Sequence, residues 1–116
     1  MASLMLEFGT VCGGRQESSG QWLDVTNPFH GKLIGRVALA TAQRVEQILQ
    51  ETHAARIDLT RRQRADVLLA MADAIDARRD EVARMITDEA GLCLKDTTYE
   101  AGRVGDVLRF SAARSL

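Results

Sequence analysis

The chain has 116 residues, enough for one domain or part of one, because domains usually contain about 100 to 200 residues. Apolar residues make up 46% of the sequence and charged residues 27%, which is typical of a globular protein and argues against a disordered or fibrous polypeptide. The formal net charge is −1, so the chain lacks the basic excess of nucleic-acid-binding proteins, and we expect no nucleic acid among its partners.

The two cysteines, Cys12 and Cys93, have no second Cys or His at the spacing of metal ligands, so neither a zinc site nor a disulfide framework is indicated. The first eight residues include no basic residue, and no run of eighteen apolar residues occurs, so we expect no secretory signal and no membrane partner. These features predict a cytoplasmic protein with reduced thiols. Aromatic residues are only 4%, which is few for a self-sufficient domain and suggests a piece of a larger fold.

Residues 1–40 are expected to form a β-hairpin region of short extended segments separated by turns. Residues 22–26 alternate in polarity and predict one strand, and residues 33–39 predict a second. The Asn-Pro-Phe-His-Gly sequence of residues 27–31 fits the loop of a hairpin between them. Another turn is expected at Gly13 and Gly14.

Residues 41–116 change to helical spacing and are expected to form four helices. The first carries a narrow apolar stripe, and the second carries a broader one behind a capping box in which Thr60 and Gln63 bond each other's backbone amides. The stripe of the first helix consists of Val45, Ile48, Leu49, Thr52 and Ala55. That of the second consists of Ala65, Leu68, Leu69, Ala72 and Ile75, widened by Val67 and Met71.

The third helix is expected to start with Asp80 as N-cap and to end at Gly91, a favourable residue just after a helix. Arg84 is four residues from both Asp80 and Asp88, so surface ion pairs are expected there. The buried face is predicted to consist of Val82, Met85 and Ile86.

The fourth helix is expected to start with Asp96 as N-cap and to run toward Arg114. Gly102 and Gly105 each cost a helix about 1 kcal/mol relative to Ala, which indicates close packing or a ligand nearby. The expected apolar face consists of Val104, Val107 and Leu108.

Taken by themselves, the residues indicate no complete active site. His30 and His53 stand apart from any nucleophile, and no Gly-x-Gly-x-x-Gly pattern follows a strand and opens a helix. Arg103 fits either a surface ion pair with Glu100 or a ligand for an anionic group, and spacing alone favours the ion pair.

A family resemblance changes this weighing. Residues 25–37 (Val-Thr-Asn-Pro-Phe-His-Gly-Lys-Leu-Ile-Gly-Arg-Val) resemble the opening of the aldehyde dehydrogenase superfamily, and similar segments follow in the family's order at residues 59–68, 79–83 and 88–91. The resemblance covers about residues 20–114. It implies an α/β fold in which a β-hairpin segment and four helices form the N-terminal part, residues 1–116, of a cofactor-binding domain.

Residues 91–103 resemble most closely the subgroup that oxidises phosphonoacetaldehyde. In that subgroup the Arg of a Glu-x-x-Arg motif helps to hold the substrate's phosphonate, and here the motif is residues 100–103. The resemblance therefore implies that Arg103 binds substrate. In several members an acidic residue at the position of Glu100 holds a monovalent cation together with main-chain oxygens equivalent to those of Val25 and Thr26. Asp is usual at that position, so we expect no metal here.

The family's nucleophilic Cys, general-base Glu and cofactor-binding strand, turn and helix are expected beyond residue 116, and Cys93 does not occupy the nucleophile's position. Residues 1–116 are thus expected to hold neither catalytic nor cofactor-binding residues and to be inactive alone. The complete chain would use NAD or NADP to oxidise an anionic aldehyde such as phosphonoacetaldehyde to the carboxylate. Its expected partners are the aldehyde, the rest of the enzyme chain and further copies in a homo-oligomer. The alternative is a free-standing helical protein-interaction module without catalysis.

Overall fold

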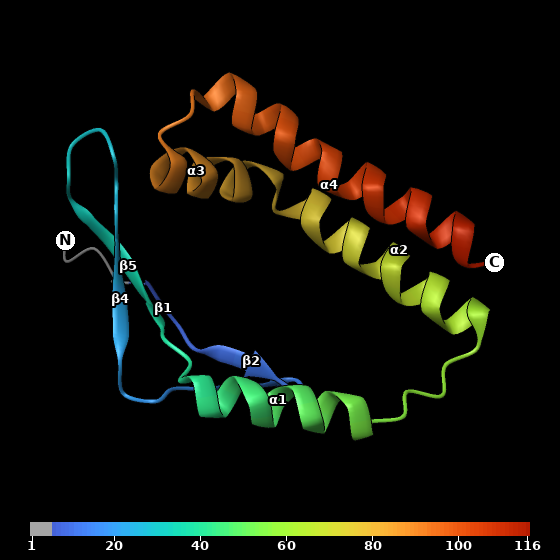
Figure 1. Ribbon diagram of the computed structural model, residues 1–116. Helices are drawn as coiled ribbons and strands as arrows, with labels where there is room; N and C mark the ends of the chain where they lie inside the picture. Colours follow the sequence, from blue (N-terminus) through green and yellow to red (C-terminus); the bar gives the residue numbers. More distant parts are fainter. Residues whose placement is uncertain (1–5) are drawn as a thin grey trace. The chain divides into compact units, whose positions relative to one another are not determined.

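The computed structural model describes residues 6–116 and shows mixed α/β structure, with small sheets followed by four helices (Figure 1). The chain divides into two compact units, Met1–Ile57 and Asp58–Leu116. The first unit contains the strands and one helix, and the second contains the other three helices.

The predicted hairpin is confirmed. Strand β4 (Trp22–Thr26) pairs antiparallel with β5 (Leu33–Ala38), which ends one residue before the expected Leu39. Strand β1 (Leu6–Phe8) adds to the free side of β5 in parallel, so the sheet order is β1-β5-β4. The strands approach closely where Gly35 faces Leu6, since a Cβ at Gly35 would lie 2.5 Å from the Leu6 carbonyl oxygen.

The loop between β4 and β5 is ordered by Asn27, which is buried. Its side-chain oxygen accepts a hydrogen bond from the Phe29 amide at 2.9 Å, and its main-chain oxygen accepts one from the Gly31 amide at 2.8 Å. Gly31 has φ of 68°, a conformation that glycine adopts without strain. The loop thus has a definite turn structure, although Phe29 at its tip is almost fully exposed.

A second hairpin joins β2 (Thr10–Cys12) to β3 (Arg15–Glu17). The expected turn at Gly13 and Gly14 is present, and both residues have positive φ, as the type I′ turn of a two-residue hairpin loop requires.

Helix α1 (Ala42–Ala54) starts at the N-cap Thr41, whose hydroxyl accepts a hydrogen bond from the Arg44 amide. Its predicted apolar stripe is not a buried face: no residue of α1 is buried, and the side chains of Val45 and Leu49 are exposed. Arg44 of α1 instead forms hydrogen bonds to Glu17, the last residue of β3. The apolar stripe of α1 stays at least partly exposed.

The second unit consists of α2 (Arg61–Ala77), α3 (Arg79–Ala90) and α4 (Leu94–Ser115), and α4 packs against both other helices (Figure 1). The predicted capping box is confirmed. The Gln63 amide donates to the Thr60 hydroxyl at 3.2 Å, and the Thr60 amide donates to the Gln63 side-chain oxygen at 2.9 Å.

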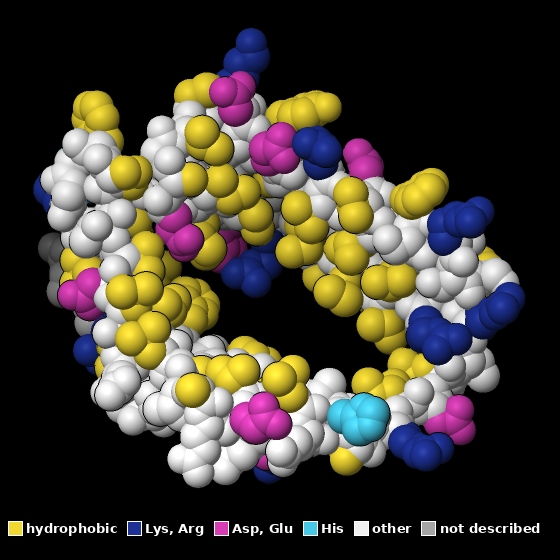
Figure 2. All heavy atoms as spheres, viewed as in Figure 1, with side chains coloured by type: hydrophobic (Ala, Val, Ile, Leu, Met, Phe, Trp, Pro, Cys, Tyr) yellow, Lys and Arg dark blue, Asp and Glu magenta, His cyan; other side chains and the backbone are white. Residues whose placement is uncertain are grey.

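Small residues make up the core of this unit, so the helices approach closely. The buried positions are Ala65, Ala72, Ala83, Thr97, Ala101, Gly102, Gly105 and Ala112. The predicted apolar face of α4 is therefore wrong for Val104 and Val107, which are exposed, while Leu108 is half-buried. Figure 2 shows apolar side chains on the surface of the molecule.

Two predicted helix starts are corrected. The N-cap of α3 is Arg78, and that of α4 is Cys93, and neither forms a side-chain cap. Asp80 and Asp96 lie instead in the first turns, where the helix dipole also favours an acidic residue. The third helix ends as expected at Gly91, which has φ of 71°.

The ion pairs predicted for Arg84 with Asp80 and Asp88 are not among those formed within residues 6–116. The pair at the start of α3 joins Arg78 and Glu81 at 2.5 Å.

Candidate functional site

Arg103 lies near the middle of α4, together with two neighbours from the same helix. Its Nη1 donates to the Glu100 carboxylate oxygens at 3.2 and 3.3 Å, and its guanidinium carbon lies 6.0 Å from the centroid of the Tyr99 ring. The three side chains come together because residues three and four apart share one helix face. The ion pair expected from spacing is therefore present.

The guanidinium of Arg103 has capacity left for another ligand. Its hydrogen bonds to Glu100 both come from Nη1, and the side chains of Arg103 and Glu100 are 56% and 48% exposed. An exposed pair of this kind contributes about 0 to 1 kcal/mol, so a competing anion loses little by displacing Glu100. The planar fork of an arginine suits a carboxylate, phosphonate or phosphate, which accepts two parallel bonds.

The opposite side of this turn is in contact with Arg79, at the start of α3. Its Nε donates to the Thr98 carbonyl oxygen at 3.4 Å, and the guanidinium covers Gly102 so closely that a Cβ there would overlap it. Of the two alternatives predicted for Gly102, close packing or a nearby ligand, the structure shows close packing. Residue spacing does not indicate the contact of Arg79 with Gly102, because this contact joins two helices.

Gly105, one turn later, is also closely packed, against charged groups. A Cβ there would lie 2.8 Å from Asp76 Oδ1 and 2.9 Å from Arg109 Nη1. Arg109 Nη2 donates to Asp76 at 2.6 Å and to Asp73 at 3.2 Å, which ties α4 to α2. These hydrogen bonds, chiefly the one to Asp76, raise the pKa of Arg109 above its usual value.

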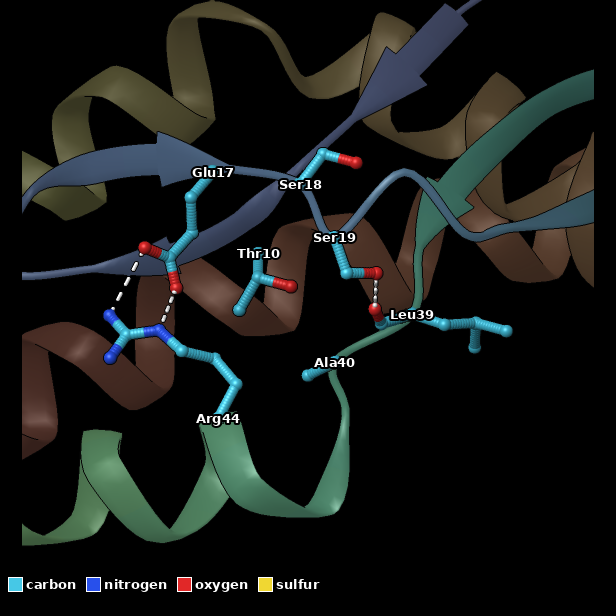
Figure 3. A pocket seen from close by; sticks show the side chains of 7 residues that line it. All are labelled: Thr10, Glu17, Ser18, Ser19, Leu39, Ala40 and Arg44. Carbon is cyan, nitrogen blue, oxygen red and sulfur yellow. Dashed lines mark hydrogen bonds and ion pairs between the residues drawn. The ribbon is translucent and has the colours of Figure 1, made fainter.

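A pocket of about 200 Å³ lies in the first unit beside Arg44 (Figure 3). It is lined by Thr10, Glu17, Ser18, Ser19, Leu39, Ala40 and Arg44. Arg44 Nε and Nη2 donate to Glu17 at 2.5 and 3.1 Å, and its Nη1 donates to Glu51 at 2.8 Å. These bonds raise the pKa of Arg44 and lower that of Glu51. Because both carboxylates already engage Arg44, it holds α1 against β3 and is not free to bind an anion.

Cys93 and His30 are separate candidates and lie apart from Arg103 in the sequence. Cys93 is an exposed free thiol at the N-cap of α4, and His30 accepts a hydrogen bond from the Lys32 amide in its loop. Val25 and Thr26 belong to the first unit and Glu100 to the second. Within residues 6–116, no three His, Cys, Asp or Glu side chains gather as a metal site would require. No helix in this part of the chain has the length and apolar character to span a membrane.

Comparison with known proteins identifies the family. Residues 15–115 match the aldehyde dehydrogenase family model. The chain belongs to this family. Aspartate-semialdehyde dehydrogenase 1 of Pseudomonas canavaninivorans is 36% identical over 93 residues, which are 78% of this chain and 20% of that enzyme. The 3,6-anhydro-alpha-L-galactose dehydrogenase of Streptomyces coelicolor is 36% identical over 87 residues, 72% of this chain and 18% of that enzyme.

A solved structure confirms the fold. The NAD-dependent aldehyde dehydrogenase of Sinorhizobium meliloti superimposes with a TM-score of 0.89 at 22% identity, over 97% of this chain and 24% of that one. The chain therefore spans about a fifth to a quarter of the length of these relatives, and its mixed α/β structure corresponds to that share of an aldehyde dehydrogenase fold. The matches establish the family and give no support to a phosphonoacetaldehyde subgroup within it.

Proposed function

We propose that residues 1–116 are the N-terminal part of the cofactor-binding domain of an NAD(P)-dependent aldehyde dehydrogenase that oxidises an anionic aldehyde to the carboxylate. Bound NAD or NADP would accept the hydride. The segment itself does not fit the cofactor: its passage from strand to helix, from β5 to α1, runs through Leu39, Ala40 and Thr41 without the glycines that let a backbone approach a pyrophosphate. Binding of the cofactor and the reaction itself would therefore depend on other parts of the enzyme.

The exposed guanidinium of Arg103 supports an anionic substrate. Its guanidinium is more than half exposed and holds Glu100 through one nitrogen only, so it can turn its other donors to the anionic end of a substrate. The relatives do not decide the substrate, since one is named for an aldehyde with a carboxylate and the other for an uncharged sugar aldehyde. Phosphonoacetaldehyde stays one candidate among anionic aldehydes.

The expected partners of the segment are the rest of the enzyme chain and, in the complete enzyme, further copies of it. The exposed apolar side chains of Val45, Val67, Met71, Val107 and Phe110 agree with a segment that folds against more protein. A free-standing interaction module would show the same exposure. Family membership over residues 15–115 favours the enzyme segment.

The test joins residues 1–116 to the remaining part of the Pseudomonas canavaninivorans enzyme and compares Arg103→Ala with the unsubstituted chain. Arg114→Ala, an exposed arginine in the last turn of the same helix, is the matched control. Loss of a charged hydrogen bond costs about 1.5 to 3 kcal/mol, so we expect kcat/KM on an anionic aldehyde to fall about tenfold or more, with little change on a neutral one. Unchanged kcat/KM on the anionic aldehyde, or equal losses on both, would exclude the role of Arg103.

A further inference from the structure

Arg79 is the first residue of α3, and its side chain extends to α4. The three atoms nearest to a Cβ built on Gly102 all belong to its guanidinium, which therefore occupies the space that a larger residue at position 102 would fill. Its Nε also donates to the Thr98 carbonyl oxygen, one helical turn earlier. Gly102 thus serves as a seat for the guanidinium.

The charge of Arg79 is directed to backbone and not to a carboxylate. The neighbouring Arg78 pairs with Glu81, whereas Arg79 takes part in none of the ion pairs formed within residues 6–116. A cationic donor strengthens a hydrogen bond to a carbonyl relative to a neutral one. Arg79 therefore holds the backbone of α4 at the turn between Thr98 and Gly102.

This turn is the one that presents the candidate anion ligand. Tyr99 and Glu100 lie within it, and Arg103 follows it directly. Arg79 contacts the buried side of the turn at Gly102, and Arg103 lies on the exposed side. Displacement of the turn would move the guanidinium of Arg103 with the helix backbone.

We propose that Arg79 is a positioning residue: seated on Gly102, it fixes the α4 turn that carries Arg103 and so orients Arg103 toward the anionic end of the substrate. The orientation of Arg103 toward substrate rests on the proposed function, whereas the coupling of Arg79 to the turn rests on the contacts alone.

Amide hydrogen exchange in the 116-residue chain tests the coupling. Arg79→Ala is expected to speed exchange of the amides of residues 102–106 about two- to tenfold, the range for loss of one hydrogen bond. Gly102→Ala should slow exchange about fivefold in the Arg79→Ala background, because Ala favours helix over Gly. With Arg79 present the slowing should be smaller, because the new Cβ displaces the guanidinium.

Gly105→Ala is the matched control, since its Cβ would meet Asp76 and Arg109 and not Arg79. Its effect should be the same with and without Arg79. Equal effects of Gly102→Ala in both backgrounds, or an Arg79→Ala variant with unchanged exchange at residues 102–106, would overturn the proposal. Exchange is measured residue by residue, so the comparison does not depend on cooperative melting of the chain.

The enzyme made by joining residues 1–116 to the remaining part of the Pseudomonas canavaninivorans enzyme tests whether Arg79 orients Arg103. Arg79→Ala should raise KM for an anionic aldehyde more than for a neutral one, and Arg79→Lys should restore part of the loss because its ammonium can still donate to the Thr98 carbonyl. If Arg103→Ala is selective for the anionic aldehyde and Arg79→Ala is not, the positioning role is wrong. If neither is selective while the exchange coupling is present, the proposed role of Arg103 fails and Arg79 acts on the helix alone.

Discussion

Thr87 of α3 and Thr97 of α4 are joined by a hydrogen bond between their hydroxyl oxygens, which are 2.8 Å apart. Thr97 is fully buried, and no larger side chain is buried as completely within residues 6–116. Its hydroxyl also donates to the Leu94 carbonyl oxygen at 3.1 Å, so Thr87 is the donor in the bond between the helices. A hydrogen bond between two hydroxyl groups, one of them buried, therefore joins α3 to α4.

Substituting Thr97 tests its hydrogen bond with Thr87. Thr97→Val keeps the shape but removes the acceptor, and we expect unfolding free energy to fall by about 1 kcal/mol. Thr87→Val should cost less after Thr97→Val than in the unsubstituted chain, because its partner is already lost. Amide hydrogen exchange of α3 and α4, which reports local opening residue by residue, measures this in the two single variants and the double variant. Strictly additive losses would show that the two hydroxyls do not interact.

The end of α3 depends on Gly91, whose positive φ is strained for residues with a side chain. Gly91→Ala is expected to destabilise the second unit by about 1 kcal/mol or more, whereas Gly91→Asn should cost less because Asn tolerates this conformation better. Hydrogen exchange of α3 amides provides the comparison. Equal exchange in the Ala and Asn variants would contradict the left-handed conformation of this residue.

The ion pair between Arg44 and Glu51, which both lie in α1, is expected to weaken in acid. Hydrogen bonds from Arg44 lower the pKa of Glu51 below its usual value. A carboxyl group with a lowered folded-state pKa stabilises the fold above its unfolded pKa, and this contribution is lost as pH falls through the folded value. Carbon-13 NMR titration of the Glu51 carboxyl should show the lowered pKa, and Arg44→Gln should return it toward normal. An unchanged pKa in Arg44→Gln would mean that the pair does not persist in solution.

The single tryptophan reports on the sheet of the first unit. The guanidinium carbon of Arg36 lies 4.7 Å from the centroid of the Trp22 ring, while its Nη2 pairs with Glu7 at 2.6 Å. Arg36→Ala uncovers the ring, so its fluorescence emission should shift to longer wavelength, and Arg36→Met should shift it less because the aliphatic stem still covers part of the ring. Identical spectra for all three chains would contradict the stacking.

Sequence patterns identified the elements with local signals. The hairpin loop at Asn27, the capping box at Thr60 and the stop at Gly91 are each determined by a few neighbouring residues, and the structure confirms them. The starts at Asp80 and Asp96 were misplaced because an acidic side chain is favourable both as N-cap and in the first turn, so composition alone does not separate the two positions.

Burial was less predictable because it depends on contacts between helices. Large apolar residues such as Val107 fit a helical stripe, yet α4 turns its small residues, such as Ala101 and Gly105, toward its neighbours. Arg103 was identified through the family resemblance, since its spacing indicates only an ion pair with Glu100. The seat of Arg79 on Gly102 had no local signal beyond the cost of a glycine inside a helix.

If the chain is a working segment of an aldehyde dehydrogenase, joining it to the rest of such an enzyme should yield activity. Aldehyde-dependent formation of NADH or NADPH would be measured for residues 1–116 joined to the remaining part of the Pseudomonas canavaninivorans enzyme, for that remaining part alone and for the 116-residue chain alone. We expect activity in the joined chain only. A folded but inactive joined chain, together with cooperative melting and no hydrophobic dye binding by the 116-residue chain alone, would contradict it and favour a free-standing interaction module.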